Sequence, residues 1–133
     1  MSNYTEIAQA IAPLWASFIE RIEFDILNLR MSLHLVAYES NTIEKHSMIF
    51  DGVSSFFFVN GEGESRFNTE QWENAELSEI HYFDPPQDSI KHTSNKAGTP
   101  QFMAEPRFYL EIWSSVLMIE AKVITVDGTS YVL

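Results

Sequence analysis

Residues 107–126, RFYLEIWSSVLMIEAKVITV, carry the strongest strand pattern in the chain. Apolar side chains alternate with other residues on both sides of Ser114-Ser115, a pair that marks a bend between two strands. Alternation with a period of two is typical of a strand that buries one face. The buried face is predicted to carry Phe108, Leu110 and Ile112 before the bend and Leu117, Ile119, Ala121 and Val123 after it.

The same alternation recurs along most of the chain and is separated by turn signals. Asp51-Gly52 interrupts a long strand-like stretch and suits a bulge or a tight turn, and Asp127-Gly128 is a dipeptide typical of hairpins. Further strands are predicted at residues 22–26, 31–38, 45–59, 77–83 and 130–133. The first two of these are close enough in sequence to predict a hairpin.

The first nineteen residues have a helical pattern instead. Six apolar residues recur at three- and four-residue spacing, which places them on one face of a helix: Ile7, Ile11, Leu14, Trp15, Phe18 and Ile19. Pro13 lacks the backbone N–H that a helix interior needs, so it predicts a kink or the start of a second short helix. We expect the apolar face of this segment to lie on the inner face of the sheet.

The sequence therefore predicts an α+β fold in a single domain, residues 1–133. The N-terminal helical segment, residues 1–19, packs on a mainly antiparallel sheet of six or seven strands within residues 20–133, curved into a barrel-like or sandwich-like form. Long loops are expected near residues 60–76 and 84–106. The predicted core consists of Ile22, Phe24, Ile26, Leu33, Leu35, Phe57, Ile80, Phe108, Leu110, Ile112, Leu117, Ile119 and Val123.

The balance of charge restricts the partners that the protein can have. Nineteen acidic residues and eight basic ones give a net charge of −11, which repels phosphate backbones and anionic lipids. We therefore expect no nucleic-acid or membrane partner, whereas a basic protein is allowed. The chain has no cysteine, and its N-terminus lacks the basic and apolar regions of a signal peptide, so a cytoplasmic location is predicted.

Residues with catalytic or metal-binding chemistry are present, but their spacing does not form a motif. The four histidines, His34, His46, His81 and His92, lack the local spacing of zinc ligands. Glu111 and Glu120 each lie in a strongly apolar strand and are interpreted as members of cross-strand ion pairs, with Arg107 and Lys122 as partners. No catalytic residue, metal site or cofactor is predicted.

An acidic block is the candidate binding surface. Residues 62–88 contain eight acidic residues and one basic residue, with aromatic residues interleaved. Aromatic anchors surrounded by charge are typical of protein interfaces, and acidic surfaces speed the encounter with basic partners. The alternative is a solvated loop whose aromatic side chains pack inward. The predicted partner-binding residues are Glu62, Glu64, Glu70, Trp72, Glu73, Glu76, Glu79 and Asp84.

Two further functions stay open beside a protein-binding module. A small-molecule-binding protein or enzyme would use a pocket near His34, His81, Tyr82 and Trp113. A self-associating structural subunit would use the three consecutive phenylalanines at residues 56–58.

The strand-and-turn patterns of three segments resemble a known family. Residues 48–58, MIFDGVSSFFF, form a strand, a turn and an aromatic strand, and residues 110–115, LEIWSS, are followed by residues 117–122, LMIEAK. This combination, in the last two-thirds of the chain, is similar to small acidic bacterial proteins of the YxiG-like type. Some of those are thought to be immunity proteins, which neutralise a toxin made by the same cell. The resemblance implies a non-enzymatic, cytoplasmic binding protein and supplies no catalytic residue.

Overall fold

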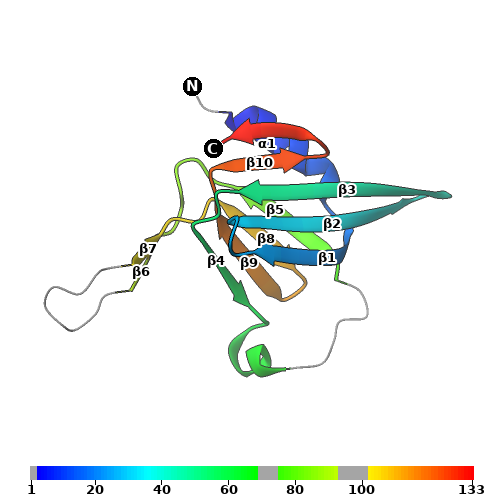
Figure 1. Cartoon of the computed structure of the whole chain (residues 1–133). Coiled ribbons are helices and arrows are strands. Elements are labelled where there is room, and N and C mark those ends of the chain that lie inside the picture. Colours follow the sequence, from blue (N-terminus) through cyan, green and yellow to red (C-terminus); the bar gives the residue numbers. More distant parts are fainter. Residues whose placement is uncertain (1–2, 69–74, 93–101) are drawn as a thin grey trace, which may run out of the picture.

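The computed structural model describes residues 3–68, 75–92 and 102–133, and most of them lie in β-strands (Figure 1). One α-helix, α1 (Tyr4–Ile11), begins the chain, and two 3-10 turns follow it at Ala12–Leu14 and Gly63–Phe67. The strands are β1 (Phe18–Asp25), β2 (Arg30–Glu39), β3 (Thr42–Asp51), β4 (Ser55–Val59), β5 (Leu77–Tyr82), β6 (Ile90–His92), β7 (Phe102–Ala104), β8 (Phe108–Ile112), β9 (Ser115–Glu120), β10 (Val123–Val126) and β11 (Thr129–Val132).

The strands form three antiparallel sheets. The first has five strands in the order β1-β2-β3-β10-β11, the second has four in the order β4-β9-β8-β5, and β6 pairs with β7 as a separate ribbon that extends away from the body of the protein (Figure 1). Sequence neighbours pair directly through hairpins, which confirms the predicted β1–β2 hairpin and the β10–β11 hairpin at Asp127-Gly128.

The chain passes between the two large sheets at two short connections. Gly52 has a φ of +66°, a conformation that glycine adopts at little cost, and it lets the chain turn from β3 into the second sheet. The return passes through Ala121 and Lys122, between β9 and β10. These two residues shift the alternation by one position, so Ile124 and Val126 are buried in β10 and Val123 is only half-buried. The sequence pattern treated this stretch as one strand and was wrong there.

The core lies between the two large sheets, with α1 at one end. Phe50 of β3 and Phe108 of β8 are fully buried, and their rings meet edge to face at 5.0 Å across the core. Burial on this scale supplies most of the stability of a domain of this size. Of the predicted core, these residues are confirmed as buried: Leu33, Leu35, Phe108, Leu110, Ile112, Leu117 and Ile119, together with Ile7, Ile11 and Leu14 of the N-terminal segment.

The α+β fold class is wrong, because the protein is mostly β. The N-terminal helix ends at Ile11, since Pro13 lies in a 3-10 turn and Ala16 has a φ of +67°, which is incompatible with a continuing helix. Phe18 and Ile19 already belong to β1. The sheet region is also more divided than predicted, since it forms sheets of five, four and two strands that do not close into a barrel in the described part of the chain.

Some predicted core residues lie at the edge of the structure instead. Ile22 is 43% exposed because β1 is the edge strand of its sheet, and Ile26 is 70% exposed because it lies beyond the end of that strand. Phe24 is half-buried against Phe56 of β4, with their ring centroids 4.7 Å apart. Alternation alone cannot distinguish an edge strand from a central one, and this explains the difference.

Candidate functional site

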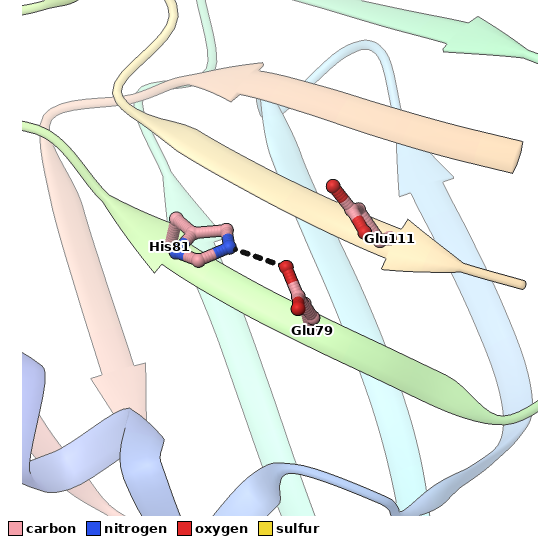
Figure 2. A group of neighbouring side chains, drawn as sticks. All are labelled: Glu79, His81 and Glu111. Carbon is pink, nitrogen blue, oxygen red and sulfur yellow. Dashed lines mark hydrogen bonds and ion pairs between the residues drawn. The ribbon is translucent and has the colours of Figure 1, made fainter.

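The outer face of the four-stranded sheet carries a cluster of ionisable side chains. In the antiparallel register of β5 and β8, Glu79 lies directly opposite Glu111, and His81 lies opposite Tyr109. Residues two apart on a strand share a face, so all four side chains project from the same side of the sheet. Figure 2 shows Glu79 and His81 on one strand and Glu111 on its neighbour.

Among the described residues, one contact stabilises the charges of this cluster. His81 Nε2 lies 2.8 Å from Glu79 Oε2, and both side chains are about half exposed. The Glu111 side chain makes no hydrogen bond or ion pair with any described residue. Two carboxylates directly opposite each other on neighbouring strands repel, which disfavours the sheet unless a cation is present.

Aromatic rings hold His81 in place. Its ring stacks on Phe83 with centroids 5.9 Å apart, and Phe83 in turn meets Tyr109 edge to face at 5.0 Å. The Tyr109 hydroxyl donates a 2.6 Å hydrogen bond to Asp88 Oδ2. Burial raises the pKa of Tyr109 to about 12, and the hydrogen bond to Asp88 and the charge of that carboxylate add to the effect. The tyrosine therefore stays a hydrogen-bond donor at any physiological pH.

A bulge beside the cluster anchors two exposed tryptophans. The β5–β8 register shifts between Leu77 and Glu79, which leaves Ser78 as the extra residue. The Ser78 carbonyl accepts a hydrogen bond from the indole Nε1 of Trp15, and the Ser78 hydroxyl accepts one of 3.1 Å from the backbone N–H of Trp113. Trp15 and Trp113 are 62% and 63% exposed.

The turn that carries Trp113 is strained. Trp113 and Ser114 are the two residues between β8 and β9, and Trp113 has a φ of +58°. Two-residue hairpin loops favour glycine, asparagine or aspartate at such positions, and a bulky residue there is an outlier that costs free energy. A large apolar side chain that is exposed, on a backbone that is strained, contributes little to the stability of the isolated chain.

The YxiG-like protein family matches residues 7–131 of the chain. The chain belongs to this family. The match confirms the resemblance that the strand-and-turn patterns indicated, and it extends that resemblance to nearly the whole chain. No curated protein matches the sequence. Among the described residues of this YxiG-like chain, no helix is long and apolar enough to cross a membrane.

The structure separates the predicted partner-binding residues. Glu62 and Glu64 are exposed at the 3-10 turn that follows β4, whereas Glu76 is half-buried and bridges to Phe18 of β1. Asp84 is held 3.0 Å from Arg107, and Glu79 alone joins the cluster with His81 and Glu111. The remaining three, Glu70, Trp72 and Glu73, lie outside the described residues.

Sequence reasoning did not identify His81, Glu111, Trp15 and Trp113 as members of one surface. Period-two alternation does place Glu111 on the outer face of its strand, but only the register of β5 and β8 shows that it faces Glu79. Trp15 was assigned to the apolar face of a helix and is exposed instead, because the helix ends before it.

The residues proposed for a small-molecule pocket do not converge either. His81 and Tyr82 are successive residues of β5, so His81 is exposed and Tyr82 is buried in the core. His34 lies on the other large sheet, in a hollow of about 390 Å³ that Arg21 and Lys45 also line. A different cavity, of about 430 Å³ and mostly apolar, lies between β4 and the β6–β7 ribbon and is lined in part by Phe57, Ile90, Phe102 and Met103.

Proposed function

We propose that this YxiG-like protein is a non-enzymatic binding protein, and that a basic protein partner docks on the surface around the Ser78 bulge. The observation that carries the proposal is the pairing of two exposed tryptophans with two facing carboxylates that have no arginine or lysine partner among the described residues. Tryptophan is enriched among the residues that dominate binding energy at interfaces, and Trp15 and Trp113 are both anchored to Ser78. We refer to Trp15, Glu79, Glu111 and Trp113 as the acidic–aromatic surface.

Charge supports a basic partner. The chain has a net charge of −11, which accelerates the encounter with a positively charged surface. At the docking site, a lysine or arginine side chain of the partner would relieve the repulsion between Glu79 and Glu111. The exposed, strained Trp113 contributes little to folding, and its burial by a partner would account for a tryptophan at this turn.

The family resemblance suggests the consequence of binding. We propose that the protein acts in the cytoplasm as an immunity-like protein, which neutralises its basic partner by occupying a surface that the partner needs. If so, the purified partner loses its activity when the chain is added at a one-to-one ratio. A partner that keeps full activity in the complex would leave the binding function standing and refute neutralisation.

The test is affinity capture from an extract of the native cells at low and high salt, read by mass spectrometry. We expect one basic protein at low salt and much less of it at high salt, because ion pairs at an exposed interface are screened. Trp113→Gly removes the side chain and suits the positive φ, so the chain should stay folded and lose the partner. Tyr38→Ala is the control, because Tyr38 is exposed to the same degree on another sheet. Equal loss in both variants, or no partner at either salt, would contradict the proposal.

The apolar cavity between β4 and the β6–β7 ribbon favours a second candidate function, the binding of a small apolar molecule. Its volume of about 430 Å³ is within the usual range of ligand pockets, and Ser54 and Ser55 supply polar groups at its wall. A thermal-shift screen with fatty acids and aromatic metabolites tests it. Stabilisation of the native chain that is lost in Phe57→Ala supports this function, and a flat response to every compound rules it out.

A further inference from the structure

The cluster on the outer face of β5 and β8 combines two carboxylates with an imidazole. Glu79, His81 and Glu111 each offer one ligand atom, and these three atoms all lie within 4.8 Å of one another. We propose that the three side chains bind a divalent transition-metal ion such as Zn²⁺ or Mn²⁺. This inference concerns the isolated chain and does not depend on the proposed protein partner.

Other carboxylates of the sheets have arginine partners, which this cluster lacks among the described residues. Asp51 lies 2.7 Å from Arg30, Asp84 lies 3.0 Å from Arg107, and Glu23 lies 3.0 Å from Arg21. Glu79 and Glu111 directly face each other, yet no arginine or lysine of the described chain contacts either of them. A divalent cation between them would neutralise both charges at once.

The backbone fixes the positions from which the three ligands project. Hydrogen-bonded strands hold Glu79 opposite Glu111, and His81 follows two residues later on the same face (Figure 2). The His81 ring is oriented by its stacking on Phe83. Fixed ring orientation is a common feature of metal-binding histidines. The Glu79 and Glu111 side chains are exposed, so both carboxylates can rotate toward an ion that His81 binds.

The donor set indicates the class of metal. Calcium and magnesium prefer oxygen ligands alone, whereas an imidazole suits zinc and other transition metals, and carboxylates suit manganese as well. Three protein ligands leave coordination positions open for water. Glu79 and Glu111 also belong to the acidic–aromatic surface, so the ion and a lysine or arginine of a docked partner would compete for the same two carboxylates.

Calorimetric titration of the full chain with ZnCl₂ and then MnCl₂, after treatment with a chelator, tests the site. We expect one ion to bind at this site, with an affinity at least tenfold weaker in His81→Ala and in Glu111→Gln. Glu111→Gln preserves the shape of the side chain and removes its charge, so its effect separates ligation from folding. His34→Ala is the matched control, because His34 lies on a strand of the other large sheet, and it should leave the affinity unchanged.

Two outcomes would overturn the proposal. One is the absence of binding of either ion by the native chain. The other is binding that His81→Ala and Glu111→Gln leave intact, which would indicate adventitious ions at other histidines or at the terminus. Capture of a salt-sensitive protein partner in the presence of chelator would still support the binding function after such a failure, so the two proposals fail separately.

Discussion

Glu111 and Glu120 lie on the same outer face of the four-stranded sheet, but their surroundings differ. Glu120 accepts hydrogen bonds from the hydroxyls of Ser54 and Ser55 and from the backbone N–H of Glu105, at 2.8 Å for the last. Glu111 faces Glu79 and has no such donor among the described residues. Glu120 therefore stabilises the contact between distant segments, whereas Glu111 remains available to a ligand.

Both glutamates lie on a sheet whose inner face packs in the core. A substitution on that inner face should have the largest effect on the free energy of unfolding. Leu110 is fully buried next to Glu111, and we expect Leu110→Ala to lower the free energy of unfolding by about 2–5 kcal/mol, the usual range for a large-to-small change in a core. Ile22→Ala is the control, since Ile22 was predicted to be core and is 43% exposed. Urea denaturation measures both, and a loss below about 1 kcal/mol for Leu110→Ala would show that its burial contributes little.

The anchoring role of Glu120 predicts the next largest effect. Glu120→Ala leaves two hydroxyls and one backbone N–H without their acceptor, and we expect a loss of about 1–2 kcal/mol, because hydrogen bonds to charged groups contribute more than neutral ones. Glu111→Ala, measured in the same urea series with chelator present, should lower the free energy of unfolding far less. An equal loss of unfolding free energy in the two variants would show that Glu111 and Glu120 have the same structural role.

Sequence reasoning predicted the strands of this face and missed the difference between its glutamates. The burial of Leu110, Ile112, Leu117 and Ile119 followed from local alternation, which is a property of each strand by itself. The donors to Glu120 come from residues 54, 55 and 105, which are distant in sequence, and the sequence indicated Lys122 instead. Register between distant strands depends on the whole fold, so local patterns do not contain it.

The same limit explains the errors in fold class. Three- and four-residue spacing continued through Leu14 and Phe18, and Pro13 predicted a kink or a second short helix but not the change to a strand at Phe18. The positive φ of Ala16 and the backbone hydrogen bond from its N–H to the Leu77 carbonyl, at 2.9 Å, direct the chain out of the helix before β1. That contact joins residues 61 positions apart in the sequence, and it became visible only with the structure.

Tyr109, two residues from Glu111 on the same face of the sheet, gives a prediction about the pH dependence of stability. Its pKa of about 12 is above the ordinary value of 10.0, so the folded state favours the protonated tyrosine. The corresponding stabilisation is complete below pH 10 and is lost as the pH rises through 12. Absorbance at 295 nm should show one tyrosine that titrates near pH 12, which is absent in Tyr109→Phe and shifts toward 10 in Asp88→Asn. An unchanged titration curve in Tyr109→Phe would contradict the assignment.

The smallest expected effect is also the one that distinguishes the two glutamates most directly. Glu111→Gln removes one of two facing like charges, so with chelator present we expect the free energy of unfolding to rise by about 0.2–0.5 kcal/mol at low salt and to rise less at high salt. Glu23→Gln is the control, because Glu23 has an arginine partner at 3.0 Å and its neutralisation should give no gain. With Zn²⁺ in place of the chelator the sign should reverse, because the native chain gains more stability from binding the ion than the weaker-binding variant does. A carboxylate that destabilises the empty site and stabilises the loaded one is a ligand, whereas a loss of stability in Glu111→Gln under both conditions would place Glu111 in the same structural role as Glu120.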